Sequence, residues 1–528
     1  MVFLFAAAFC VHVAFAQTPL TFASTFLGDS VVVEAGGALV FGSTAPGQGV
    51  KIYLAGEYVS SATSDATGFF FSTLPSRPPS LEYVDLLAVD GRNETAAARV
   101  KMGRVLICSG QSNAQMPLQG YCATPGKPPC INGTDSGGFG SANGTAEMLA
   151  AGAFTGKISI MTLETPFPRP STWNGTNCGG WPPEPPSPSC TPQPQWNAVT
   201  PGADGTVRGF SAVCWYTGKA MFNMLGGTTP IGLIAGSVGG SPIALWLGKD
   251  VIGHGGVPAD DPICDNAGNI TDSLFFDALI APFAPYTLGA MVWDQGERDV
   301  HCFAPATFKT DVYPLWESAL IRSWRDTFIS PSSAFAAVQL PGYIGDCDLN
   351  NADQPLANYS WCVPGVFNMR LAQAAGVANI TLASIVPTYD LSCPFGVNTP
   401  QCPWGSVHNL IKEPIGVRLA QSLLAALEPS RFQPVSGPTL VSVDAGPTGR
   451  GYWNVQLNFD DSTTTQAPTQ YCSDCCEGLV GDFDASADGG VTFVNGTLPN
   501  VLGSGALAFI VKLPTKPTHI RYTANQGL

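Results

Sequence analysis

Ser112 stands at the point where a buried strand is predicted to end. The apolar run from Val105 to Cys108 is followed by Ser-Gly-Gln-Ser-Asn, a turn of small and polar residues that presents the hydroxyl of Ser112. Hydrolytic α/β folds display a serine nucleophile at the carboxyl edge of a strand in this way. The same pattern also occurs in ordinary connections between a strand and a loop, so the turn predicts chemistry only together with partners elsewhere in the chain.

A serine that attacks an ester needs a general base, and histidine is the natural base at neutral pH. Four of the five histidines lie in unsuitable places: His12 in the N-terminal apolar segment, His254 in a glycine-rich loop, His301 beside a cysteine and His519 in the C-terminal region. His408 instead follows the last predicted strand of the same sheet and precedes a predicted helix. Elimination therefore favours His408, because the loops after parallel strands meet at one edge.

Two other segments at predicted strand ends could donate hydrogen bonds to the negatively charged oxygen that forms when an ester is attacked. In Gly-Ser-Val-Gly-Gly-Ser-Pro-Ile, Gly239 and Gly240 have no side chain to keep a ligand away from their backbone N–H groups. In Trp-Asp-Gln-Gly-Glu, the Gln295 amide is a donor, and Glu297 with the nearby Asp299 could orient partners. Each segment is also compatible with a plain turn, and both remain open as oxyanion donors.

The pattern of residues 101–430 predicts a doubly wound α/β domain with a parallel sheet. Continuous apolar runs, typical of strands buried on both faces, alternate there with helical stretches. The predicted strands are Arg104–Cys108, Ile158–Leu163, Ile231–Ser237, Leu288–Trp293, Phe335–Leu340 and Ile380–Tyr389. Amphipathic spacing predicts one helix over 308–328 and another over 413–427, where Pro414 suits the first turn.

The chain of 528 residues is too long for a single hydrophobic core, and its two flanking regions have the pattern of smaller β domains. Residues 17–100 carry short β-rich runs between Gly, Pro and Ser turns, which predict a small β-sandwich or barrel. Residues 431–528 return to alternating patterns and predict a second small β domain, which could pack back against the first. The formal charge of −15 argues against nucleic acid and anionic membranes as partners.

Residues 1–16 predict a secretory signal peptide, because Val2 to Ala16 is almost wholly apolar and Ala14-Phe15-Ala16 fits a cleavage site. The stretch is short for a membrane span, and no later segment is apolar enough to cross a bilayer, so no span is expected in the mature chain. Eight Asn-x-Ser/Thr sequons agree with export, at Asn93, Asn132, Asn143, Asn174, Asn269, Asn358, Asn379 and Asn495. We therefore expect a secreted or lysosomal glycoprotein.

Cysteine usage also favours an oxidising compartment. Sixteen cysteines, of which Cys10 lies in the signal segment, leave an odd number in the mature chain. Closely spaced cysteines are expected to form disulfides whose connectivity the sequence leaves open: Cys122 and Cys130, Cys178 and Cys190, Cys347 and Cys362, Cys393 and Cys402, and the group Cys472, Cys475 and Cys476. Cys108, in a buried strand, is the expected unpaired thiol. The chain contains no repeated Cys-x-x-Cys pair typical of zinc sites, and we expect no metal or organic cofactor.

Five segments together resemble the sialate O-acetylesterases, which belong to the SGNH hydrolases. They are, in chain order, 109–116, 231–243, 289–297, 323–328 and 405–408, and the likeness extends to the small β domain before the serine. The resemblance implies a serine esterase on a flavodoxin-like α/β fold. It also implies the removal of O-acetyl groups from sugars, especially from the 9-position of sialic acid.

Carried over position by position, the resemblance implies Ser112 as the nucleophile and His408 as the base. The oxyanion hole would then be formed by the Ser112 amide, a Gly239 or Gly240 amide, and the Gln295 side chain. An acetylated plant or microbial polysaccharide is an alternative substrate. A catalytically inactive glycan-binding protein is an alternative of a different class.

The chain departs from the family's pattern at three positions. Ala114 replaces a methionine, and Asp294 replaces a tyrosine beside the expected oxyanion donor. Gly405 stands where an aspartate is often found, three residues before the histidine. Asp390, at the end of the preceding predicted strand, resembles the Asp-Leu-Cys stretch of these esterases and is the expected acid of the triad.

Overall fold

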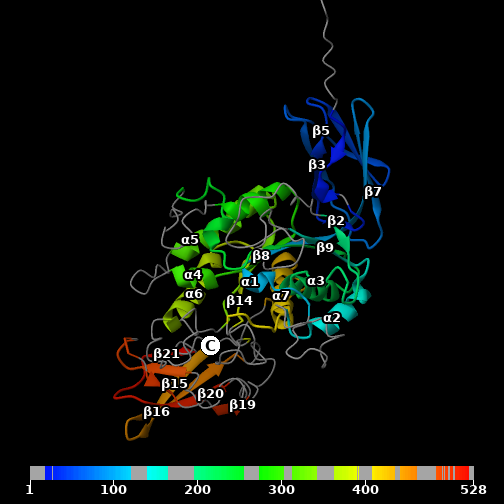
Figure 1. Ribbon diagram of the computed structural model, residues 1–528. Coiled ribbons are helices and arrows are strands. Elements are labelled where there is room, and N and C mark those ends of the chain that lie inside the picture. Colours follow the sequence, from blue (N-terminus) through cyan, green and yellow to red (C-terminus); the bar gives the residue numbers. More distant parts are fainter. Residues whose placement is uncertain are drawn as a thin grey trace, which may run out of the picture.

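The structure, a computed structural model, has a mixed α/β fold in which smaller antiparallel sheets flank a central sheet with parallel strands (Figure 1). It describes residues 18–26, 28–119, 140–163, 195–254, 273–302, 312–341, 362–388, 391, 407–434, 440–460, 483–489, 491–492, 494–496, 500–503 and 506–522. Within these residues, no helix has both the length and the apolar character that a bilayer span requires.

The central sheet contains six parallel strands. In spatial order they are β9 (Ile158–Thr162), β11 (Ile231–Ser237), β8 (Thr95–Gly110), β12 (Ala290–Asp294), β13 (Ala334–Val338) and β14 (Ala383–Val386), with β10 (Asn197–Ala198) antiparallel at the β9 edge. Each overlaps one of the predicted apolar runs, so the predicted parallel sheet is confirmed. The near-complete burial of β9, β11, β12 and β13 explains why their apolar runs are continuous rather than alternating.

The order of the strands places a reversal of winding beside β8. The chain leaves β8 to build β9 and β11 on one side, and then crosses to build β12, β13 and β14 on the other. In open α/β sheets, ligands bind outside the carboxyl ends of the strands at such a reversal. Ser112 lies two residues after the end of β8, so the sheet topology places it at this reversal.

Helices cover both faces of the central sheet (Figure 1). On one face, α3 (Ala212–Met224) and α7 (Glu413–Leu427) pack with Leu106 and Cys108 of β8. On the other, α5 (Val312–Thr327) and α6 (Cys362–Val377) pack with Val105 and Ile107, because successive strand residues point to opposite faces. Helix α7 has the predicted bounds, and α5 lies within the predicted 308–328. Helix α3 is buried nearly all round and lacks an amphipathic period, so the sequence pattern did not reveal it.

The N-terminal strands form the upper part of the molecule in Figure 1 and continue into the central sheet. The elements there are β1 (Thr21–Phe22), η1 (Ser24–Phe26), β2 (Val31–Glu34), β3 (Ala38–Ser43), β4 (Gly49–Leu54), β5 (Glu57–Thr63), β6 (Phe69–Leu74) and β7 (Val84–Asp90). The 16-residue strand β8 pairs first with β2 and β7 and then with β11 and β12. One continuous strand therefore crosses the division predicted between residues 100 and 101.

The C-terminal strands form two small antiparallel sheets around their own core. Their bounds are β15 (Leu440–Gly449), β16 (Tyr452–Phe459), β17 (Phe483–Ser486), β18 (Val494–Asn495), β19 (Asn500–Gly503), β20 (Ala506–Lys512) and β21 (His519–Tyr522). They lie at the end of the molecule opposite the N-terminal strands (Figure 1). The suggestion that these two β regions pack against each other is therefore wrong, since the central α/β layers separate them.

Shorter elements border the carboxyl edge of the sheet or connect its strands. They are α1 (Ser112–Gln115), α2 (Gly144–Ala150), η2 (Ala151–Phe154), η3 (Ile243–Trp246), η5 (Phe276–Ile280), η6 (Ala281–Phe283) and α4 (Glu297–Cys302). Helix α1 begins just after β8 and helix α4 just after β12, so each of these two neighbouring strands is followed by a helix at its carboxyl end.

Candidate active site

The structure brings Ser112 and His408 into contact at the carboxyl edge of the central sheet. Ser112 is the first residue of α1, and His408 lies between β14 and α7. The hydroxyl Oγ of Ser112 and Nε2 of His408 are 2.8 Å apart. That distance is typical of a hydrogen bond in which the imidazole can accept the hydroxyl proton. Both residues are partly exposed.

Gly110 allows the nucleophile turn to form against β12. Its φ of +142° lies in a region that side chains disfavour, and a Cβ there would come within 2.0 Å of the Asp294 carbonyl oxygen. The next residue, Gln111, donates its backbone N–H to the same carbonyl at 3.0 Å. The end of β8 is therefore fixed to the end of β12 immediately before Ser112.

Asn113 connects the nucleophile helix to the segment that carries His408. Its side chain is buried, and Nδ2 donates to the Val407 carbonyl at 2.9 Å and to Oε1 of Glu297 at 2.5 Å. Its Oδ1 accepts a hydrogen bond from Nζ of Lys412 at 2.7 Å. Sequence reasoning missed Asn113 and Lys412, and the only available signal was their position next to Ser112 and close behind His408.

The glycine turn after β11 lies directly against the nucleophile. A Cβ placed on Gly239 would be 3.4 Å from Cβ of Ser112 and 3.2 Å from Oε1 of Gln115. The Gly239 N–H donates to Oε1 of Gln115 at 2.9 Å, and Gly240 adopts a φ of +73°. The structure therefore brings the predicted glycine pair to Ser112, and it shows that Gln115, which sequence reasoning missed, engages one of their amides.

The Gln295 side chain lies in the protein interior, where it forms hydrogen bonds with neighbouring residues. Its side chain is fully buried, with Nε2 within hydrogen-bond distance of Oε1 of Gln111 (3.2 Å), the Ser241 carbonyl (3.1 Å) and Oδ2 of Asp299 (2.5 Å). Its Oε1 accepts from the Tyr313 hydroxyl at 3.0 Å. An amide nitrogen has only two hydrogens, so in this arrangement both are committed to neighbours other than Ser112.

Asp299 links Gln295 to the segment that follows the glycine turn. Its Oδ2 accepts from the Ile243 backbone N–H at 3.1 Å as well as from Gln295. Burial raises the pKa of Asp299 from 3.8 to about 6, and the hydrogen bond from Gln295 opposes that shift. The Asp299 carboxyl therefore connects Gln295, just after β12, to Ile243, in the segment that follows Gly239 and Gly240. These contacts are compatible with the predicted orienting role of Asp299.

Asp294, one of the three departures from the family pattern, is buried. Burial raises its pKa to about 6, and the Lys412 ammonium opposes the shift. Burial and the neighbouring Asp294 raise the pKa of Glu297 to about 7, while Lys412 lowers it. The Asp294 carboxyl therefore belongs to an interior group of charges that includes a cation.

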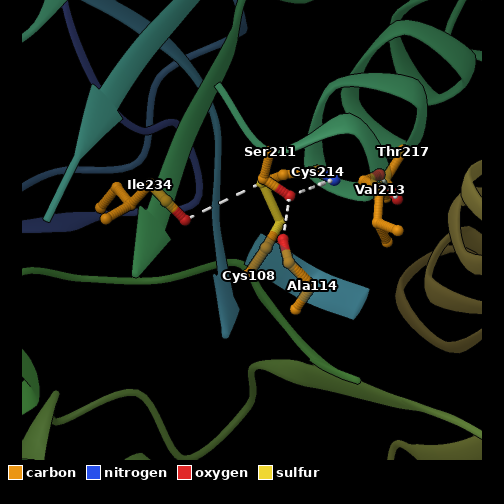
Figure 2. Close-up of a disulfide and its surroundings, with 7 residues drawn as sticks. All are labelled: Cys108, Ala114, Ser211, Val213, Cys214, Thr217 and Ile234. Atoms are coloured by element: carbon orange, nitrogen blue, oxygen red, sulfur yellow. Dashed lines mark hydrogen bonds between the residues drawn. A yellow bond between two sulfur atoms is a disulfide. The ribbon is translucent and has the colours of Figure 1, made fainter. Parts of the chain in front are cut away.

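Cys108 forms a disulfide with Cys214, so the expectation that Cys108 is an unpaired thiol is wrong. Figure 2 shows the bridge joining β8 to the first turn of α3. The two Cα atoms are 5.7 Å apart, and the cysteines are 106 positions apart in the sequence. The sequence argument considered only neighbouring cysteines, whereas the packing of α3 on the sheet brings Cys214 to Cys108. Next to the bridge, the Ser211 hydroxyl donates to the Ala114 carbonyl at 2.6 Å and accepts from the Cys214 N–H at 3.2 Å (Figure 2).

The other sequence-predicted residues lie apart from Ser112 or outside the described residues. His254 is exposed in a turn, and His519 is exposed on β21. Asp390, Gly405, the side chain of His301, and at least one member of each predicted local cysteine pair lie outside the described residues. Within the part of the chain that the structure describes, no three His, Cys, Asp or Glu side chains form a group suited to a metal ion.

Comparison with known proteins confirms the predicted resemblance to sialate O-acetylesterases. The chain is 29% identical over 236 residues to the sialate O-acetylesterase of Homo sapiens. The matched region covers 43% of this chain and 41% of that protein. It is 27% identical over 262 residues to the enzyme of Rattus norvegicus, 42% of this chain and 44% of that protein. The match thus spans about two fifths of the length of these curated relatives. No family model matches the sequence.

Among solved structures, the chain resembles a carbohydrate acetylesterase from Xanthomonas citri. The TM-score is 0.64 at 18% sequence identity, and the superposition covers 96% of this chain and 95% of that one. Nearly the whole chain therefore shares the overall fold of a carbohydrate acetylesterase.

Proposed function

We propose that this protein is a serine esterase that removes O-acetyl groups from sugars. His408 accepts the proton of the Ser112 hydroxyl as Oγ attacks the acetyl carbonyl carbon. When the tetrahedral intermediate collapses, the protonated His408 returns the proton to the sugar oxygen, which leaves as a hydroxyl, and an acetyl ester remains on Ser112. Water, deprotonated by His408, then attacks that ester and releases acetate.

The 2.8 Å contact between Oγ of Ser112 and Nε2 of His408 carries this proposal. An enzyme needs such a contact because serine is a weak nucleophile until a base takes its proton. A glycan-binding protein has no use for it, so the geometry favours catalysis over the inactive alternative. Asp294 places a carboxyl next to Gln295 in the sequence, which had made an inactive protein thinkable. In the structure this carboxyl is buried near Lys412 inside the protein, so it gives no support to the inactive alternative.

The oxyanion of the tetrahedral intermediate would be stabilised by backbone donors at Ser112 and at the Gly239–Gly240 turn. A Cβ added to Gly239 would come into van der Waals contact with Ser112, and the Gly239 N–H becomes available to the oxyanion once Gln115 releases it. Gln295 then acts on this site through Ser241 and Asp299, which hold the chain around the turn. We keep Asp390 as the proposed acid that orients His408, on the family resemblance alone.

We infer that the fold is the flavodoxin-like arrangement of the SGNH hydrolases, on the strand order around β8 and the likeness to the Xanthomonas citri enzyme. Sialic acid bearing a 9-O-acetyl group is the proposed substrate, because the sequence relatives are named sialate O-acetylesterases. An acetylated polysaccharide is the second candidate, since the structural relative is a carbohydrate acetylesterase.

The proposal is tested first with p-nitrophenyl acetate and the Ser112→Ala variant. We expect the oxidised, glycosylated protein to hydrolyse this ester and the variant to be inactive. Equal rates for both proteins would show that Ser112 is not the nucleophile, and no turnover by either would favour the glycan-binding alternative. Acetate release from 9-O-acetylated sialic acid, compared with acetylated xylan at equal acetyl concentration, then decides between the two substrates.

We also propose that the protein is exported to the cell exterior or to lysosomes. The Cys108–Cys214 disulfide supports an oxidising compartment, and the sequon residues Asn93, Asn143 and Asn379 are exposed where a glycan could be attached. Mass spectrometry of the protein from a secreting eukaryotic cell should find Gln17 as the first residue and glycans on these asparagines. Retention of residues 1–16 in the folded product would contradict the proposed signal peptide.

A further inference from the structure

We propose that Lys412 is a positioning residue: its buried ammonium group fixes the Asn113 amide, which in turn holds the His408 segment against Ser112. The inference rests on the proposed function, because it assumes that Ser112 and His408 react together. Lys412 is 1% exposed and immediately precedes α7. A cation at a helix N-terminus opposes the helix dipole, so the helix itself gives no reason for a lysine there.

Lys412 decides which way the Asn113 amide faces. An ammonium group can only donate hydrogen bonds, so the atom of Asn113 next to Nζ, at 2.7 Å, must be the oxygen Oδ1. The opposite side of the amide then presents Nδ2, whose two hydrogens meet the Val407 carbonyl and Oε1 of Glu297. A reversed amide would place an oxygen against both of those acceptors.

The contact between Asn113 and Val407 runs parallel to the catalytic contact. Asn113 is next to Ser112 in the chain, and Val407 is next to His408. The two segments are therefore joined twice, once by the imidazole and hydroxyl and once by the Asn113 amide and the Val407 carbonyl. The second bond limits how far the His408 backbone can move away from the nucleophile, and it requires the amide orientation that Lys412 sets.

The buried acids explain how a lysine can remain charged in this place. Burial lowers the pKa of Lys412 to about 8, while Asp294 and Glu297 raise it. The ammonium in turn favours the ionised forms of both carboxyls. Without the cation, the two acids would lie in the interior with no positive charge near them. Asp294 and Glu297 therefore both favour the charged form of Lys412, which is the form that donates to Asn113.

The test compares Lys412→Met with a matched control, Lys101→Met. Lys101 is also buried and donates to the Gly156 carbonyl, but it lies within β8, 11 positions before Ser112. With p-nitrophenyl acetate we expect Lys412→Met to lower kcat by about tenfold to hundredfold with KM changed less than twofold, as misplacement of a catalytic group does. Lys101→Met should leave both constants near the wild-type values in the folded protein.

Asn113→Asp provides the second variant. It preserves an oxygen for Lys412 but removes the donor to Val407, so a folded variant should lose kcat to the same extent as Lys412→Met. Because both substitutions act through one contact, the double variant should be no slower than the slower single variant. If Lys412→Met does not fold, Asn113→Asp decides alone, and an unchanged kcat overturns the proposal.

The outcome separates this inference from the proposed function. If the wild-type protein is active and Ser112→Ala is inactive, but Lys412→Met retains its kcat, Lys412 is not a positioning residue although the esterase assignment holds. Independent, multiplicative losses in the Lys412 and Asn113 variants would also overturn it. If the wild-type protein itself lacks activity that depends on Ser112, the esterase proposal fails and the positioning role fails with it.

Discussion

Oγ of Ser112 lies 2.8 Å from Nε2 of His408, although the two residues are 296 positions apart in the chain. The serine follows β8 in the middle of the sheet, and the histidine follows β14 at its edge. Parallel strands bring their carboxyl ends to one side of the sheet, and the segment before α7 returns along that side. The sheet topology thus turns two distant loops into neighbours.

Ser112→Ala and His408→Gln are each expected to lower kcat for p-nitrophenyl acetate by about 10^4-fold or more. The two side chains act as one unit, because the base has no function without the hydroxyl that it deprotonates. The Ser112→Ala/His408→Gln double variant should therefore be no slower than the slower single variant. Losses that multiply in the double variant would show that the two residues work independently.

Gly239→Ala is expected to lower kcat/KM by about 10- to 100-fold without unfolding the protein. The added methyl group would lie 3.4 Å from Cβ of Ser112 and 3.2 Å from Oε1 of Gln115, where the acetyl group must enter. Gly209→Ala is the control, because its Cβ would meet no atom within 4 Å. Steady-state kinetics and thermal unfolding are measured for both variants. Full activity of Gly239→Ala would show that this glycine turn is not part of the active site.

Gln295→Ala is expected to lower stability as well as activity. The substitution leaves Asp299, Ser241 and Tyr313 without the buried amide that they contact, and each buried polar group left unpaired costs about 1–3 kcal/mol. Urea unfolding of the folded variant measures the loss. A variant that is inactive but as stable as the wild type would instead support direct donation by Gln295 to the oxyanion.

Removal of the Cys108–Cys214 disulfide is expected to lower the free energy of unfolding by about 2–5 kcal/mol. The bridge closes a loop with a sequence separation of 106, and loops of about 100 residues lie near the upper end of that range. Urea unfolding of the Cys108→Ala/Cys214→Ala double variant tests this value. Peptide mapping of the unreduced protein gives an independent check, since a free Cys108 thiol would contradict the pairing.

The stability of the protein is expected to fall as the pH rises above about 4.5 because of Glu317. This carboxyl is fully buried, no described residue forms a hydrogen bond with it, and burial raises its pKa well above 4.5. The folded state then holds a proton that the unfolded state has lost, so the stabilisation is present at low pH and is lost towards the folded pKa. Each unit of difference in pKa corresponds to roughly 1.4 kcal/mol.

Asp299 adds to the same trend, because burial raises its pKa from 3.8 to about 6. Urea unfolding at a series of pH values between about 5 and 7.5 should show the decline, and Glu317→Gln should make it shallower because an amide does not titrate. Asp326→Asn, which changes an exposed carboxyl on the same helix, serves as the control. An unchanged slope in Glu317→Gln would show that this carboxyl does not retain its proton in the folded protein.

The sequence by itself predicted the strands of the central sheet, helix α7, and Ser112, His408, Gly239 and Gly240 as candidate site residues. His408 was reached by elimination among the histidines. The others followed from local signals: an apolar run that ends in small residues, a 3.6-residue period after a proline, and a glycine pair that leaves backbone amides open. Such signals lie within a few residues of each other in the chain, so they can be read before the chain is folded.

The tertiary structure alone decided the partners of these residues. Cys214 reaches Cys108 because α3 packs on the sheet, and Gln295 turns inward because Tyr313 and Asp299 surround it. Lys412 gave no sign in the sequence of its contact with Asn113, since the two are 299 positions apart. Contacts of this kind depend on which faces of helices and strands meet, a consequence of packing that no local pattern of residues encodes.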